Sequence, residues 1–285
     1  MFCDMHIHSN YSDCTLTPKE IIDLAMERGL SAIALTDHNS VSGLPDFFKA
    51  GQGKSIDLVG GAEFSTEYMG TELHILGLFI PPEFYKVVEE FTDNSFKAKL
   101  KSNIDLCEKI RRTGVDITYD EVKATVNSGK VNRANIASVL VKKGYAETVQ
   151  DAFEKYLYKK AGFYVPAKKP SSLEVIEFIN KIGAVSVWAH PFLNIKDTEK
   201  MRKILADFKT CGLDGMEVNY PSYDEETTKK AVALAEEFSI IKSGGSDFHG
   251  DNKPHIALGT GKGNLAIPYS VYTELYSRYR DKHKV

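Results

Sequence analysis

Two histidines stand close together near the start of the chain, in the stretch DMHIHSNYSD that runs from Asp4 to Asp13. Alternate residues of an extended strand project to the same side, so His6 and His8 can direct two imidazoles at one point. A metal ion requires such an arrangement, but an HxH pair alone is a weak signal, and a surface or hydrogen-bonded role is more common for a histidine. The pair therefore needs support from the rest of the chain.

Further residues of metal-binding type recur where buried strands are predicted to end. Parallel strands of an α/β barrel bring their carboxyl ends to one face, where active sites form. Residues from distant parts of the chain would converge there, and a group of buried imidazoles without a metal would be costly. We therefore predict a multinuclear metal site made of His6, His8, Asp13, His38, Glu63, His74, His190, Asp247 and His249.

Alternating strands and helices must position these side chains. A helix is predicted over residues 17–29, because Thr17 and Glu20 form a capping box and Pro18 stands in the first turn. Helix-then-strand units return after residue 170, and such units imply parallel strands, about seven of which fit a barrel better than an open sheet. The predicted strands cover residues 2–7, 31–38, 56–65, 71–80, 184–191, 213–220 and 240–250.

The middle of the chain has a different pattern. Residues 83–169 read as long polar helices without a convincing strand, so we expect a barrel domain of residues 1–82 and 170–285 with an inserted helical cap domain of residues 83–169. The segment from Glu83 to Lys169 has 17 Lys and Arg against 12 Asp and Glu, whereas the whole chain has a net charge of −3. A basic segment in an acidic chain suggests contact with an anion, although a solvated helical surface is the more common cause.

The composition is that of an ordinary globular protein of 285 residues. The amino terminus lacks a basic region followed by an apolar run, and no stretch reaches the roughly 18 apolar residues of a membrane span. The four cysteines show no CxxC spacing, which disfavours a zinc ribbon and a disulfide framework. We therefore expect a cytoplasmic protein with reduced thiols and no membrane partner.

Six motifs in sequence order carry a family resemblance. DMHIHSNYSDCTLTP, ALTDHNSVSGLP, GAEFS, LHILG, AHP and GGSDFH resemble the successive motifs of the PHP (polymerase and histidinol phosphatase) family, and most of all its stand-alone bacterial phosphoesterases with an inserted helical domain. The resemblance runs from residue 4 to about residue 250. It implies a distorted (β/α)₇ TIM-like barrel and three divalent metal ions, the first bound by His6, His8, Glu63 and Asp247, the second by Glu63, His74 and His190, and the third by Asp13, His38 and His249.

The ligand types indicate the chemistry. Imidazole and carboxylate suit Mn, Fe or Zn, and the set contains no thiolate. Metal ions about 3.5–4 Å apart can share a hydroxide and hold it in line with a phosphorus atom, so no serine or cysteine nucleophile is needed. Ser246 is not part of a GxSxG nucleophile motif, since the second glycine is absent.

An arginine in the inserted segment points to a phosphate. Arg133 in VNRANIA stands where related enzymes have the arginine of a GRPHIA-like segment, and a guanidinium can hold a phosphate through two hydrogen bonds, although Arg133 could simply begin a helix. Two positions depart from the family pattern. Asn135 replaces a histidine, which puts the role of that position in doubt, and Cys14 replaces a glycine beside Asp13. Asp37 is expected to support His38, and Tyr220, Tyr223 and Phe248 could stack on a base or simply pack.

We therefore predict a metal-dependent phosphoesterase that hydrolyses a phosphate monoester of a small nucleotide-like substrate, such as a nucleoside 3′,5′-bisphosphate or a short single-stranded oligonucleotide. A histidinol-phosphate-type phosphatase remains an alternative, as does a noncatalytic PHP accessory module, although such modules tend to lose ligands. An amidohydrolase would usually show a different ligand order. The negative net charge disfavours a long nucleic acid.

Overall fold

The computed structural model describes residues 1–126 and 131–284. Seven strands form one sheet in the order of the chain. Ile7 at the end of the first strand pairs with Phe248 just after the seventh, and the His8 amide donates a hydrogen bond to the Phe248 carbonyl at 3.1 Å. The sheet therefore closes into a distorted seven-stranded barrel, as predicted. Its strands are β1 (Phe2–Ile7), β2 (Leu30–Leu35), β3 (Asp57–Tyr68), β4 (Thr71–Leu78), β5 (Val185–Ala189), β6 (Gly215–Asn219) and β7 (Ile241–Gly244).

One strand departs from the expected parallel arrangement. β4 runs antiparallel to both β3 and β5. Only two residues, Met69 and Gly70, join β3 to β4, and both have positive φ, at 49° and 73°. Such a tight hairpin reverses the chain, whereas a parallel connection needs a crossover of a dozen or more residues. The reversal sets His74 of β4 opposite Ser65 of β3 and Ala189 of β5.

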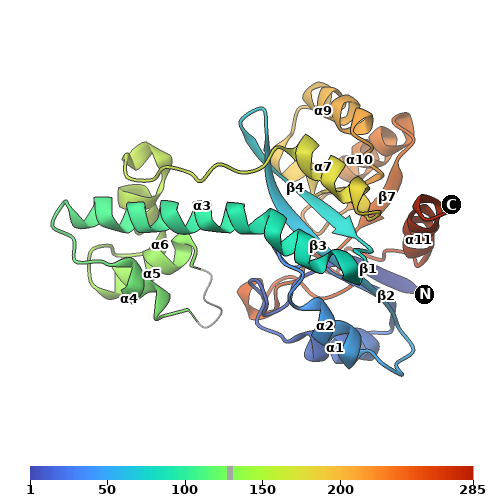
Figure 1. Cartoon of the computed structure of the whole chain (residues 1–285), viewed down its shortest axis with the longest axis horizontal. Helices are drawn as coiled ribbons and strands as arrows, with labels where there is room; N and C mark the ends of the chain where they lie inside the picture. Colours follow the sequence, from blue (N-terminus) through green and yellow to red (C-terminus); the bar gives the residue numbers. More distant parts are fainter. Residues whose placement is uncertain (127–130, 285) are drawn as a thin grey trace. The chain divides into compact units, whose positions relative to one another are not determined.

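Helices surround the barrel (Figure 1), and the first of them begins at the predicted capping box. The Thr17 side chain accepts a hydrogen bond from the Glu20 amide, and the Glu20 carboxylate accepts one from the Thr17 amide. Ser171 and Glu174 form the same capping box before a later helix. The helices of this part are α1 (Pro18–Glu27), α2 (Leu44–Ala50), α7 (Ser172–Lys181), α8 (Pro191–Asn194), α9 (Thr198–Thr210), α10 (Glu225–Glu237) and α11 (Ser270–Lys282), with 3₁₀ turns at Pro82–Phe84 and Gly250–Asn252.

An apolar cluster fills the barrel below the carboxyl ends of its strands. Met5 of β1, Ala34 of β2 and Val187 of β5 are buried in it, and α11 contributes Val271 and Leu275. The α11 helix is also tied to the barrel by ion pairs, since the buried Asp214 carboxylate accepts from Arg278 Nε at 2.7 Å and from Lys282 Nζ at 2.5 Å. The apolar interior leaves the polar residues at the strand ends as a separate layer.

The chain divides into two compact units. The barrel unit comprises Met1–Glu90 with Pro170–Val285, and the helical unit comprises Phe91–Lys169. The helical unit packs around a core of its own that includes Leu106, Ile136 and Leu140, and its described residues contain no strand. The predicted inserted domain includes residues 127–130, which lie outside the described residues. The helices of this part are α3 (Tyr85–Arg111), which starts in the barrel unit, α4 (Tyr119–Lys123), α5 (Arg133–Lys142) and α6 (Val149–Ala152), followed by a π-helical turn at Phe153–Leu157 and a 3₁₀ turn at Lys159–Ala161.

Among the described residues, no helix combines the length and the apolar character needed to cross a lipid bilayer.

Candidate metal centre

The structure brings together all nine residues that the sequence nominated as ligands. They lie on or just after six of the barrel strands or in the loop that follows β1. The ligands form three groups, and within each group the ligand atoms lie no more than 4.8 Å from one another. The groups are His6, His8, Glu63 and Asp247; His38, Glu63 and His74; and His8, Asp13, His38 and His249. His190 joins them through Nε2, which lies 3.0 Å from Glu63 Oε1.

The first group is the most deeply buried. His6 and His8 are fully shielded from solvent, and their Nε2 atoms lie 3.2 Å apart, as expected for alternate residues at the end of a strand. Both Nε2 atoms lie 3.3 Å from Glu63 Oε2, and His8 Nε2 also lies 3.1 Å from Asp247 Oδ1. Two imidazoles and two carboxylates thus face a common point.

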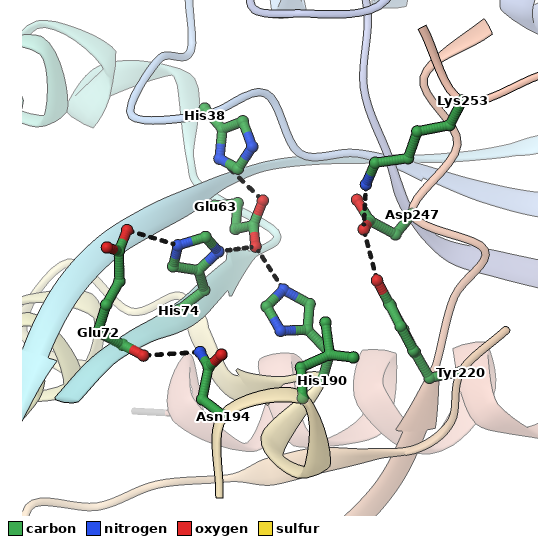
Figure 2. A pocket seen from close by; sticks show the side chains of 10 residues that line it. His38, Glu63, Glu72, His74, His190, Asn194, Tyr220, Asp247 and Lys253 are labelled. Carbon is green, nitrogen blue, oxygen red and sulfur yellow. Dashed lines mark hydrogen bonds and ion pairs between the residues drawn. The ribbon is translucent and has the colours of Figure 1, made fainter. Parts of the chain in front are cut away.

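Glu63 lies among His38, His74 and His190 (Figure 2). Its Oε1 atom lies 2.6 Å from His74 Nδ1 and 3.0 Å from His190 Nε2. Its Oε2 atom lies 2.9 Å from His38 Nδ1 and also faces the His6 and His8 pair. One carboxylate therefore presents each oxygen to a different set of imidazoles, which is the geometry of a bridging ligand.

The third group lies around Asp13. His249 Nε2 is 3.3 Å from Asp13 Oδ1, and His38 Nε2 is 3.6 Å from Asp13 Oδ2. The Asp13 side chain is 43% exposed, in contrast to the buried first group. This side of the centre is therefore open to solvent.

The donor atoms fit divalent cations. Glu63 Oε2 and His38 Nδ1 lie 2.9 Å apart but outside hydrogen-bonding geometry, so that neither buried atom has a hydrogen-bond partner among the described residues. Buried polar atoms are rarely left in this state, because losing water without a new partner is costly. Imidazole nitrogens and carboxylate oxygens are suitable ligands for Mn, Fe or Zn, and a cation between them would satisfy these atoms.

The close packing of imidazoles and carboxylates in the centre shifts the pKa values of these groups. Burial favours the neutral form of the Glu63 carboxyl, but the charges of His38, His74 and His6 outweigh burial and hold its pKa well below the usual range. Burial disfavours the charged form of His8, yet the carboxylates of Asp247 and Glu63 raise its pKa to about 9. The raised pKa favours a proton on His8 beside these carboxylates, and a divalent cation bound there would replace that proton.

The chain adopts unusual backbone geometry at two of the nine residues. His190 and Asp247 have positive φ, at 32° and 53°, in the left-handed region that residues other than glycine rarely occupy. The Asp247 amide donates to the His6 carbonyl at 2.8 Å, which fixes the loop after β7 against β1. Only glycine fits at position 245, because a Cβ there would lie 2.3 Å from the His6 Cβ. These features hold Asp247 and His6 side by side.

Supporting carboxylates hold several of the candidate ligands. Glu217 of β6 was not predicted from the sequence and is fully buried. Its Oε1 lies 3.1 Å from His6 Nδ1, and its Oε2 accepts a hydrogen bond from the His190 amide at 2.6 Å. A charged residue within an otherwise apolar strand was the available signal. Asp37 accepts hydrogen bonds from the Ser9 amide at 2.8 Å and the Ser12 hydroxyl at 2.5 Å, so it fixes the loop that leads to Asp13.

The aromatic residues named from the sequence are buried beside the centre. The Tyr220 hydroxyl donates to Asp247 Oδ2 at 2.7 Å, and the Tyr223 hydroxyl accepts from the Phe192 amide at 2.9 Å. Phe248 pairs through its backbone with Ile7.

Cys14 is buried, and burial raises the pKa of its thiol to about 11, which disfavours a reactive thiolate.

Arg133 is the first residue of α5 in the helical unit. Its guanidinium carbon lies 4.2 Å from the centre of the Tyr164 ring, and Nη1 donates to the Leu157 carbonyl at 3.2 Å. Asn135 completes a capping box with Asn132 at the start of the same helix. Both residues thus have structural partners within their own unit, and the phosphate role of Arg133 stays a prediction.

A cavity of about 300 Å³ opens over the centre in the barrel unit. Figure 2 shows candidate ligands and neighbouring polar side chains around it. It is lined by His38, Glu63, Glu72, His74, His190, Leu193, Asn194, Tyr220, Asp247 and Lys253.

Comparisons with known proteins identify the family of the chain. The sequence pattern of the PHP domain family matches residues 4–165. A 5′-3′ exoribonuclease of Haemophilus influenzae is 32% identical over 86% of this chain and 89% of its own length. A 3′,5′-nucleoside bisphosphate phosphatase of Chromobacterium violaceum is 28% identical over 96% of both chains. The crystal structure of a Bifidobacterium adolescentis protein assigned as a metal-dependent phosphoesterase superposes with a TM-score of 0.79 at 28% identity and covers 97% of this chain and 96% of that protein. The chain therefore belongs to the PHP domain family.

Proposed function

We propose that this chain is a metal-dependent phosphoesterase that hydrolyses the phosphate monoester of a small nucleotide-like substrate. The observation that carries the proposal is the Glu63 carboxylate, whose two oxygens face imidazoles from several barrel strands at 2.6–3.3 Å. The names of the relatives support the substrate class, since one is called a nucleoside bisphosphate phosphatase and another a 5′-3′ exoribonuclease.

Three divalent cations, Mn, Fe or Zn, are the cofactors in this proposal. Bound there, they would supply an activated water and neutralise the oxygens of the reacting phosphate. The first would be held by His6, His8, Glu63 and Asp247, the second by Glu63, His74 and His190, and the third by Asp13, His38 and His249.

The protein contributes the positioning of these ligands. Glu217 holds His6 Nδ1 and thereby leaves His6 Nε2 directed at the centre, as a carboxylate does for many metal-binding histidines. Burial of the first group keeps bulk water away from it, while the exposed side at Asp13 and the adjoining cavity leave a path for substrate. The histidines and carboxylates act as ligands, so no side chain has to form a covalent intermediate.

A short 5′-phosphorylated oligonucleotide is a second candidate substrate. The observation that favours it is the likeness to the H. influenzae exoribonuclease, which covers 86% of this chain. The excess of basic residues in the segment 83–169 suits either a second phosphate of a small bisphosphate or the next phosphate of a strand. In both cases we propose that Arg133 contacts a phosphate of the substrate.

The test is a screen of phosphate release with protein reconstituted separately with Mn, Fe and Zn. The substrates are adenosine 3′,5′-bisphosphate, AMP, histidinol phosphate and a 5′-phosphorylated trinucleotide, with nucleotide products separated by chromatography. We expect metal-dependent turnover of the bisphosphate or the trinucleotide that is abolished by His190→Ala. Turnover should be retained by His255→Ala, since His255 is exposed and is not one of the nine candidate ligands. Absence of metal-dependent turnover on every ester would contradict the proposal, and a clear preference for histidinol phosphate would replace its substrate class.

A further inference from the structure

Lys253 is the one lysine or arginine among the described residues that line the cavity of the barrel unit. It stands between the 3₁₀ turn Gly250–Asn252 and Pro254, six residues after the candidate ligand Asp247. The other charged groups that line the cavity are carboxylates and histidines. A phosphate dianion that entered the cavity would therefore meet several anionic groups and one fixed ammonium.

The ammonium of Lys253 touches the candidate centre directly. Nζ lies 2.7 Å from Asp247 Oδ2, and the same oxygen accepts the Tyr220 hydroxyl at 2.7 Å (Figure 2). The other carboxylate oxygen, Asp247 Oδ1, faces His8 Nε2 at 3.1 Å. Lys253 thus binds the outer oxygen of a residue whose inner oxygen belongs to the first group of candidate ligands.

The position of Lys253 is built into the barrel and is not that of a free surface side chain. The preceding turn is anchored to the loop that carries Asp13, because Asn252 Nδ2 donates to the Asp13 carbonyl at 2.7 Å and the Asp251 amide donates to Thr15 Oγ1 at 3.0 Å. Gly250 makes this close approach possible, since its φ is 60° and a Cβ there would lie 2.2 Å from Thr15 Oγ1. The lysine side chain remains 36% exposed and lines the cavity.

We propose that Lys253 is a substrate-binding residue that contacts an oxygen of the reacting phosphate. An ammonium carries three N–H donors, and the contact with Asp247 uses one of them, so two remain for an incoming anion. A cation held by Asp247 would draw negative charge from that carboxylate and so weaken its attraction for the Lys253 ammonium. An oxygen of the substrate phosphate would then serve as the anionic partner of the ammonium. This inference rests on the proposed function, but it concerns a residue outside the nine candidate ligands.

The alternative is that Lys253 only holds Asp247 in place. Four variants separate the two roles. Lys253→Met removes the charge and the donor, whereas Lys253→Gln removes the charge but keeps an N–H donor for Asp247 Oδ2. Tyr220→Phe removes the other donor from the same oxygen. Lys262→Met removes an equal charge from an exposed lysine of the same polypeptide segment and serves as the matched control.

Each full-length variant is loaded with Mn, and its metal content is measured. The dissociation constant for inorganic phosphate is determined by calorimetry, and kcat/KM is measured separately on the best substrate. We expect Lys253→Met and Lys253→Gln to retain their metal and to bind phosphate roughly 10- to 100-fold more weakly, as for loss of a charge-assisted contact. We expect kcat/KM to fall by a similar factor, while Lys262→Met behaves like the wild type.

Two results would overturn the inference. One is an unchanged phosphate affinity in both Lys253 variants. The other is a combination of two observations: Lys253→Gln binds phosphate as tightly as the wild type, and Lys253→Met and Tyr220→Phe lose metal to the same extent. That combination would show that Lys253 only positions Asp247. Phosphate binding needs no turnover, so a wild-type protein that hydrolyses none of the esters would contradict the proposed function while the calorimetry still decides the role of Lys253. If Lys253→Met does not fold, the same comparison is made with Lys253→Gln.

Discussion

Glu217 Oε1 lies 3.1 Å from His6 Nδ1, the ring nitrogen that faces away from the other candidate ligands. Both side chains are fully buried, and the second oxygen of Glu217 accepts the His190 amide. One carboxylate from β6 therefore orients a histidine of β1 and the backbone that carries another candidate ligand after β5. Such outer partners fix the ring orientation of a metal-binding histidine and increase its basicity.

Glu217→Gln should weaken metal binding by roughly 10- to 100-fold, because the amide keeps the size of the side chain but loses the negative charge that favours the required tautomer of His6. The measurement is a competition titration with a chelator of known affinity. Glu27→Gln in the exposed part of α1 is the matched control. An unchanged metal affinity in Glu217→Gln would show that the contact with His6 serves packing alone.

The stability of metal-free protein should fall as the pH rises from about 6.5 to about 9. Neighbouring carboxylates outweigh burial and raise the pKa of His8 and His74 to about 9, so the folded state holds protons that the unfolded state releases near the ordinary histidine value. This stabilisation is complete below about pH 6.5 and is lost as the pH passes the raised values.

Urea denaturation of chelator-treated protein across this pH range is the measurement. We expect the free energy of unfolding to decrease by at least about 1.4 kcal/mol, the equivalent of one pKa unit. Metal-loaded protein should lack this decrease, because cations replace the protons. A constant free energy of unfolding in the metal-free protein would contradict the prediction.

Arg133→Ala should lower kcat/KM by roughly 30- to 1000-fold without removing metal, if the guanidinium contacts a substrate phosphate. Arg133→Lys should recover only part of the loss, since an ammonium lacks the planar fork. The measurement compares adenosine 3′,5′-bisphosphate with AMP. A loss confined to the bisphosphate would assign Arg133 to the nonreacting phosphate, whereas an equal loss on both substrates would assign it to the reacting one.

The contacts of Arg133 with Tyr164 and Leu157 require a control for folding of the helical unit. Tyr164→Leu removes the aromatic ring under the guanidinium and keeps the arginine. If Arg133→Ala and Tyr164→Leu lower the melting temperature alike and leave kcat/KM unchanged, the arginine is structural and the phosphate role is wrong.

The ends of buried strands were the most informative part of the sequence. His6, Glu63 and Asp247 could be nominated because an apolar run that closes on an ionisable residue is visible in one dimension, and the barrel brings such ends to one face. The direction of β4 was not predicted from the helix-then-strand rule, because it depends on the two-residue hairpin at Met69 and Gly70.

The supporting residues could not be found in the same way. Glu217 acts on a histidine 211 positions away, and the place of Lys253 depends on a turn that is anchored to the loop of Asp13. No spacing in the sequence encodes these contacts, which arise only when the barrel closes.

The most direct test of the shared metal centre is the metal content of Glu63→Gln beside the wild type, measured by elemental analysis after reconstitution with excess Mn and paired with an assay of phosphate release. A carboxylate that bridges two cations holds them at the spacing that catalysis needs. We predict about three ions per chain in the wild type, the loss of more than one ion in Glu63→Gln, and no turnover even with excess metal. Full metal content with near-normal turnover in Glu63→Gln, or a single ion in the wild type, would contradict this prediction.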